Sequence, residues 1–173
     1  MVEGRAVSLD GSELVTRYRA GERDFSRAHV RFADLSEVDL REIDLSGAKL
    51  VDVDLRRANL AGADLSWASL LGVNLEGANL AGATASQIVL HGADLRWADV
   101  QHADLRRADL ERANLTEANL RGADLSEAHL RGATLDGANL EEARVTLEQL
   151  ARARSLREAI LPDRGGLDGK RRV

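Results

Sequence analysis

A leucine recurs at every fifth position through most of this 173-residue chain. Residues 103–125 show the pattern, with Ala two places before each Leu: ADLRRADLERANLTEANLRGADL. If the leucine is taken as the centre of a pentapeptide, 25 centres run without interruption from Phe25 to Val145. A period of five matches neither the 3.6 residues of a helical turn nor the alternation of a strand. The repeat therefore decides which folds are available.

A coil satisfies this period if each pentapeptide forms one short side and a turn. The central residue and the residue two before it then point inward, while the other three point outward. The inner position before the centre is mostly Ala, which suits a corner, and is Val or Ile at five sites. Asp or Asn usually stands just before the centre, where its side chain can bond to backbone N–H groups of the turn. We expect an all-β solenoid.

Three stretches resemble the A-(D/N)-L-x-x repeats of the pentapeptide-repeat proteins: ANLAGADLSWASL, GADLRWADV and ANLTEANLRGADL. The resemblance covers residues 23–145. It implies a right-handed quadrilateral β-helix with four pentapeptides per coil, hence about six coils, stacked about 4.8 Å apart.

Both ends of such a solenoid need covering, because terminal coils expose core leucines and strand edges. Residues 1–22 are expected to form an N-terminal segment with a capping helix. The stretch GSELVTRYRAGERDF predicts that this helix has Ser12 as its N-cap and stops at Gly21.

The C-terminal end is expected to carry a helix and a last repeat within residues 146–163. Thr146 followed three places later by Gln149 is a capping-box pattern. The last repeat is centred on Leu161, one residue out of the earlier register. Residues 164–173 are expected to form a disordered tail.

Residues twenty apart should stack, so the residues of each outward column of the coil can be read from the sequence. One of these columns consists mostly of Asp. Its carboxylates, called here the acidic column, are Asp24, Asp44, Asp64, Asp104 and Asp124. Two carboxylates about 4.8 Å apart in water repel each other by roughly 1 kcal/mol, so a cationic partner would bind here favourably. The alternative is that Asp occurs at these sites only for its turn hydrogen bonds.

The next face carries apolar residues at positions that point outward. Val51 and Leu71 should stack, Val89 lies in the neighbouring column, and Trp67 adjoins them across the corner. Exposed apolar patches commonly mark interfaces. These residues, with Leu147 and Leu150 of the C-terminal helix, are therefore candidates for self-association as a homodimer; the alternative is neutral scatter of apolar residues over the surface.

Signals for chemistry are weak. The chain has no Cys, its four His are dispersed along it, and no phosphate-binding, nucleophile-elbow or dinucleotide motif occurs. A shaft filled with Leu should leave no pocket. We expect a protein that is not an enzyme, with no catalytic, cofactor or metal site. The sequence also lacks a signal peptide or membrane-spanning run, so we expect a cytoplasmic protein that does not enter the membrane.

Two functions fit a rod of this kind. The resemblance implies a protein–protein interaction module that mimics DNA, binds a type II topoisomerase such as DNA gyrase and protects it from poisons. The alternative is a structural scaffold or adaptor with another protein partner. Residues 24–145 hold 21 acids and 13 bases. Direct binding of nucleic acid is disfavoured, because such a shaft would repel phosphates.

Overall fold

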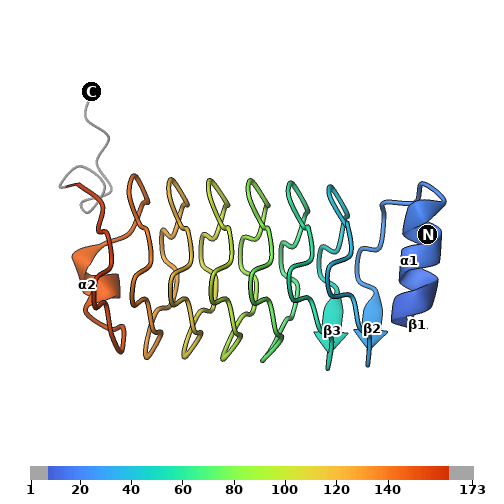
Figure 1. The fold of residues 1–173 in the computed structure, drawn as a ribbon, viewed down its shortest axis with the longest axis horizontal. Helices are drawn as coiled ribbons and strands as arrows, with labels where there is room; N and C mark the ends of the chain where they lie inside the picture. Colours follow the sequence, from blue (N-terminus) through green and yellow to red (C-terminus); the bar gives the residue numbers. More distant parts are fainter. Residues whose placement is uncertain (1–7, 164–173) are drawn as a thin grey trace.

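The computed structural model of the protein describes residues 8–163, which form a rod of stacked coils (Figure 1). The elements in chain order are β1 (Ser8–Leu9), α1 (Gly11–Arg19), β2 (His29–Arg31), β3 (Lys49–Val51) and α2 (Leu147–Leu150). Between β3 and α2 the chain consists of turns and single parallel bridges. The expected disordered tail lies outside the described residues.

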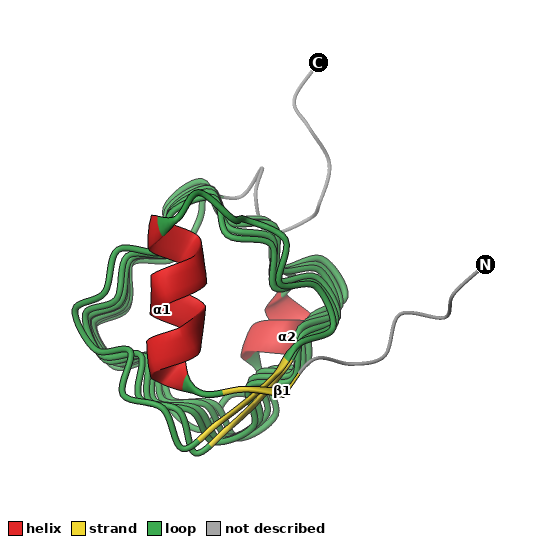
Figure 2. Cartoon of the chain, turned by 90° about the vertical axis from the view of Figure 1, so that its right-hand side faces the viewer, coloured by secondary structure: helices red, strands yellow, loops and turns green. Residues whose placement is uncertain are grey.

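The bridges confirm the twenty-residue register. Asp24 pairs with Asp44, and Asp39 pairs with Asn59, in parallel orientation. A typical pentapeptide donates two backbone hydrogen bonds to the next coil and one to the coil before. Leu40 N–H donates to Asn59 O at 2.8 Å, Glu42 N–H to Ala61 O at 3.0 Å, and Asn59 N–H to Val38 O at 2.9 Å. Four pentapeptides therefore make one turn of the coil, which has a four-sided outline seen end-on (Figure 2).

The core consists of the central residues and the residues two before them, as the period predicts. Leu75 and Ala78 have no exposed surface, and the same pair of positions is buried in almost every pentapeptide. Within residues 8–163 no polar or charged side chain is buried. Aliphatic packing and the hydrogen bonds between coils thus hold the rod together.

The turns depend on two positions. The residue just before the centre accepts, through its side chain, a hydrogen bond from the backbone N–H of the residue two places later. Asp64 accepts from Ser66 at 2.9 Å, and Asn79 accepts from Ala81 at 3.0 Å. This confirms the predicted turn role of Asp and Asn. The residue two after the centre has a φ between 51° and 73° in every pentapeptide from Arg27 to Glu142, whether or not it is Gly.

α1 crosses the N-terminal end of the coil (Figure 2). Leu14 is buried in the core, and Val15 and Tyr18 pack against it. The predicted N-cap was wrong. Asp10 caps the helix, accepting the Glu13 N–H at 2.8 Å, while the Ser12 hydroxyl donates to the same carboxylate. Asp10 wins because its extended backbone leads directly into the first helical residue, whereas Ser12 already lies within the helix.

α2 begins after Thr146, and the predicted capping box is present. Gln149 N–H donates to the Thr146 hydroxyl, and the Gln149 side chain accepts the Thr146 N–H. Before α2, Asp124 pairs with Arg144, twenty residues on; after it, Asn139 pairs with Ile160, twenty-one residues on. The predicted shift of one residue is therefore present, and it is taken up by α2.

Candidate protein-interaction surfaces

The structure places the acidic column in one ladder. Parallel bridges join Asp24 to Asp44 and Asp44 to Asp64; Thr84 then interrupts the column, and Asp104 follows and is bridged to Asp124. The five carboxylates therefore stand on one side of the coil, on successive turns apart from the position of Thr84.

The two carboxylates beyond Thr84 have arginine partners. Asp104 Oδ2 lies 2.6 Å from the guanidinium of Arg106, and Asp124 Oδ2 lies 3.3 Å from that of Arg144. The hydrogen bond from Arg106 also holds the pKa of the Asp104 carboxyl below its ordinary value. This half of the acidic column is neutralised by the chain itself.

The other three carboxylates are different. Within residues 8–163, Asp24, Asp44 and Asp64 form no ion pair, and each accepts the backbone N–H of the serine two residues on. Hydrogen bonds from the Ser26 hydroxyl and N–H lower the pKa of Asp24. No cation of the described residues lies within ion-pair distance of these three carboxylates.

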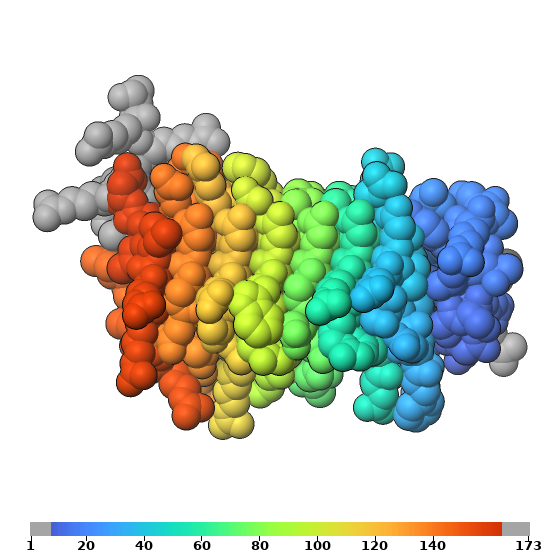
Figure 3. Space-filling model, viewed as in Figure 1, coloured from blue at the N-terminus to red at the C-terminus, as the bar shows by residue number. Residues whose placement is uncertain are grey.

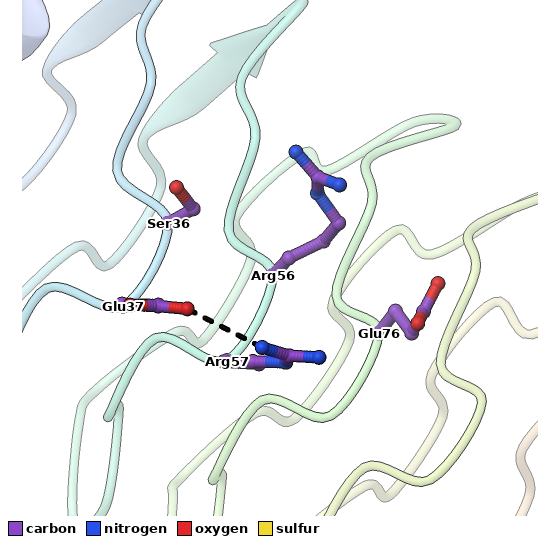
Figure 4. A pocket seen from close by; sticks show the side chains of 5 residues that line it. All are labelled: Ser36, Glu37, Arg56, Arg57 and Glu76. Carbon is purple, nitrogen blue, oxygen red and sulfur yellow. Dashed lines mark hydrogen bonds and ion pairs between the residues drawn. The ribbon is translucent and has the colours of Figure 1, made fainter.

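Elsewhere on the shaft, opposite charges stack on neighbouring coils. Arg57 lies 3.4 Å from Glu37 (Figure 4), and Arg96 lies 2.9 Å from Glu76. Arg107 pairs in the same way with Glu127. These pairs neutralise carboxylates locally, but they leave the shaft's excess of 21 acids over 13 bases unchanged. Carboxylates outside the acidic column, such as Asp34, Asp52 and Asp99, also form no ion pair among the described residues. Sequence reasoning missed these pairs, although each joins residues twenty apart, because the rotamers of the long side chains decide whether stacked charges meet.

Most of the apolar residues predicted for self-association are on the surface. Leu71 and Trp67 are well exposed, Val51 less so, and Val89 is half-buried; Leu147 of α2 is also exposed. The prediction for Leu150 was wrong: its side chain is 3% exposed and belongs to the core. α2 turns Leu150 inward over the last coil, so it cannot contact a partner.

Hollows on the shaft are lined largely by charged and polar groups, although one of about 360 Å³ beside α2 also includes Ala128 and Leu130. Another hollow, of about 180 Å³, lies among Ser36, Glu37, Arg56, Arg57 and Glu76, where Arg57 pairs with Glu37 (Figure 4). Arg56 pairs with Asp54 of its own turn. On the side shown in Figure 3 successive coils lie against one another along the rod. Among the described residues no group of His, Asp and Glu could hold a metal ion. Neither helix of residues 8–163 has the length and apolar character needed to cross a bilayer.

Comparison with known proteins gives the family. The sequence profile of pentapeptide repeats matches in eight copies that lie between residues 24 and 146. No curated protein matches the chain.

Similar solved structures include three proteins of different origin. A pentapeptide repeat protein from the Arabidopsis thaliana thylakoid lumen is 32% identical over 61% of this chain and 66% of its own, with a TM-score of 0.39. One from Nostoc PCC 7120 is 34% identical over 72% and 88%, with a TM-score of 0.39. QnrB1, a plasmid-mediated fluoroquinolone resistance protein, is 18% identical over 91% and 92%, with a TM-score of 0.43.

The present chain spans just under two thirds of the Arabidopsis protein's length. Pentapeptide-repeat proteins fold as right-handed quadrilateral β-helices, in agreement with the twenty-residue register of the bridges. Since the family profile covers well over half of its residues, the chain belongs to the pentapeptide-repeat family.

Proposed function

We propose that this protein is a non-enzymatic interaction module that binds a basic surface of a protein partner through the acidic column. One observation carries the proposal: Asp24, Asp44 and Asp64 stand in one column on consecutive coils, and none of them forms an ion pair within the described residues. A row of uncompensated carboxylates attracts a cationic surface and orients it along the rod.

The DNA-binding surface of a type II topoisomerase is the partner that best fits this chemistry. Consecutive coils place one carboxylate about every 4.8 Å, and one strand of duplex DNA places a phosphate about every 3.4 Å along its axis. A rigid rod with such a row can occupy a groove built for DNA. With this partner, the protein acts in the cytoplasm and protects the enzyme from poisons that act on its DNA complex.

The alternative is a scaffold or adaptor. Paired charges on neighbouring coils make much of the shaft electrically neutral, and a neutral rod can simply hold partners apart. Under this function the row of Asp side chains serves the turns alone.

A gyrase supercoiling assay, with and without a poison, separates the two functions. The test variant is Asp24→Asn, Asp44→Asn, Asp64→Asn, which keeps the turn-accepting oxygen and removes three charges. The control is Asp34→Asn, Asp54→Asn, Asp94→Asn, which removes the same number of charges. These residues accept the same kind of turn hydrogen bond and lie half a coil away. Because Asp54 and Asp94 also pair with Arg56 and Arg96, urea unfolding is used to check that both variants stay folded.

If the proposal holds, the wild type and the control alter supercoiling or poison-induced cleavage, and the test variant does not. If the wild type has no effect on either readout, the topoisomerase is excluded as the partner, and the adaptor function is the one that stands. A test variant as active as the wild type shows that the acidic column is not the contact surface.

A further inference from the structure

Few cations of the shaft lack an anionic partner. Of the thirteen Lys and Arg in residues 24–145, nine form ion pairs. The other four are Arg27, Arg31, Lys49 and Arg112, whose side chains make no ion pair, hydrogen bond or ring contact with any described residue. Three of these four lie together near the N-terminal end of the shaft.

Four exposed apolar side chains of the shaft lie beside those three cations. Phe32 is 78% exposed, Trp67 62%, Leu71 61% and Val51 43%. The backbone register brings them together. Arg31 pairs with Val51, Phe32 N–H donates to Val51 O at 3.1 Å, and the Lys49–Ser69 bridge sets Leu71 beside Val51 on the next coil.

These seven residues form what we call the N-terminal patch. It lies over β2 and β3, on the side of the coil where the only continuous strands occur within residues 8–163 (Figure 2). Trp67 stands at the corner that separates the patch from the acidic column. The protein therefore carries an uncompensated negative surface and an uncompensated positive, apolar surface on adjoining sides of the same coils.

We propose that the N-terminal patch binds a short acidic segment of another protein, one that also presents apolar side chains. The three cations have no ion-pair partner and outnumber Asp52, the acidic residue within the patch, so they attract further carboxylates. The exposed aromatic and aliphatic side chains supply the desolvated contacts that give such a segment its affinity. This inference does not depend on the topoisomerase or on the acidic column.

The size of the patch favours a segment over a second copy of the chain. Phe32, Val51 and Leu71 span three coils, or about 10 Å along the rod. A stable dimer interface buries about 800 Å² on each partner, which requires a face nearly three times as long in both directions.

The surrounding charge disfavours extended polyanions. Asp52 lies within the patch and forms no ion pair in residues 8–163, and Asp24, Asp44 and Asp64 adjoin it across the corner. A DNA duplex or an anionic bilayer would reach these carboxylates, whereas a short segment can contact the cations and avoid them.

Trp67 provides the readout. The chain has two Trp residues, so the Trp97→Phe background leaves Trp67 as the single indole. The probe is a short synthetic peptide in which Glu and Leu alternate, and its matched control has Lys in place of Glu. The proposal predicts that the Glu peptide shifts the Trp67 emission to the blue and saturates, and that the Lys peptide does not.

Variants locate the contact. Two variants should each lower the affinity for the Glu peptide by about tenfold or more, as expected for contacts at the centre of an interface. They are Leu71→Glu and the double variant Arg31→Glu, Lys49→Glu. Arg112→Glu makes the same kind of charge change at the unpaired cation outside the patch and should leave affinity unchanged. The Asp24→Asn, Asp44→Asn, Asp64→Asn variant should also bind as the wild type, so failure here is distinct from failure of the acidic column.

Four results would overturn the inference. The first is that the Lys peptide binds as tightly as the Glu peptide, and the second is that Leu71→Glu binds the Glu peptide as tightly as the wild type does. The third is that a short DNA duplex or phosphatidylserine vesicles bind more tightly than the Glu peptide. The fourth is that light scattering shows a wild-type dimer that Leu71→Glu abolishes. The last would assign the patch to a second copy.

Discussion

At the scale of single residues, the left-handed turn position is the most demanding feature of the coil. All 24 turns from Arg27 to Glu142 hold this residue at positive φ, and only nine use Gly. A left-handed conformation costs a residue with a Cβ about 1–2 kcal/mol. The larger residues are nevertheless useful there, because the side chain points outward and can reach a neighbouring coil, as Arg57 and Arg107 do.

Glycine at this position should matter to different degrees along the rod. In Gly82→Ala the new Cβ would have no atom within 4 Å. This substitution should cost only the free energy of holding an alanine in the left-handed conformation, about 1 kcal/mol. Gly122→Ala should cost more, because the new Cβ would overlap the imidazole of His102. Urea unfolding checks both. In a His102→Ala background the two glycine substitutions should cost the same, and a persistent difference would contradict the steric explanation.

Ala85 is the one centre reduced to a methyl group, and it is fully buried. The large residue at the next inner position, Ile88, is also buried, and we expect it to fill the space that a leucine would have occupied. Ile88→Ala should therefore destabilise the protein by about 2–5 kcal/mol, more than Val73→Ala, because the centre that precedes Val73 is the leucine Leu70. Equal losses in urea unfolding would show that Ile88 does not compensate for Ala85.

The residue pattern predicted the core well and the surface poorly, for physical reasons. Burial of apolar side chains every five residues follows from the period alone, so the two inner positions could be assigned without coordinates. The positive φ could not, because residues as different as Trp67, Glu127 and Gly72 share it. Ion pairs between coils also stayed hidden, since they depend on long outward side chains with several rotamers.

At the scale of elements, the turn carboxylate is the recurring unit. Asp54, Asp94 and Asp104 each accept the N–H of the arginine two residues on and also bind its guanidinium. The side-chain hydrogen bond from the arginine is the main cause that lowers the pKa of each carboxyl below the ordinary 3.8.

This lowering fixes the sign of the acid dependence. A carboxyl whose pKa is lower in the folded state contributes stability above its unfolded pKa, and that contribution is lost as the pH falls through the folded value. We expect unfolding free energy to drop as the pH is lowered past 3.8. The variant Asp54→Asn, Asp94→Asn, Asp104→Asn should show a shallower drop. An unchanged pH profile would show that these pairs do not contribute.

α2 depends on one side chain that sequence reasoning credited only with the capping box. The Gln149 amide donates to Leu125 O at 2.7 Å and to Ala128 O at 2.8 Å, so it ties the helix to the last full coil. Gln149→Ala should destabilise the protein by about 1–3 kcal/mol, because these carbonyls lose their donor. Glu148→Ala, on the exposed side of α2, should have little effect on thermal unfolding; equal effects would contradict this role.

At the scale of the whole molecule, the rod separates its charges. Each coil contacts only its neighbours, so surface chemistry can change from coil to coil while the core stays uniform. Near the N-terminal end of the shaft one side presents Asp24, Asp44 and Asp64, and the adjoining side presents unpaired cations with exposed apolar side chains. The sequence predicted the acidic column as a whole. Only the structure divides it at Thr84 into an uncompensated and a neutralised half.

The salt dependence of binding to gyrase tests the central claim most directly. If Asp24, Asp44 and Asp64 make the contact, the affinity of the wild type falls steeply as salt rises, because screening limits exposed charges to about 8 Å at physiological ionic strength. The Asp24→Asn, Asp44→Asn, Asp64→Asn variant should bind weakly with a shallow slope, and the Asp34→Asn, Asp54→Asn, Asp94→Asn control should keep the wild-type slope. Identical slopes for the wild type and both variants would contradict the claim that the acidic column binds the partner.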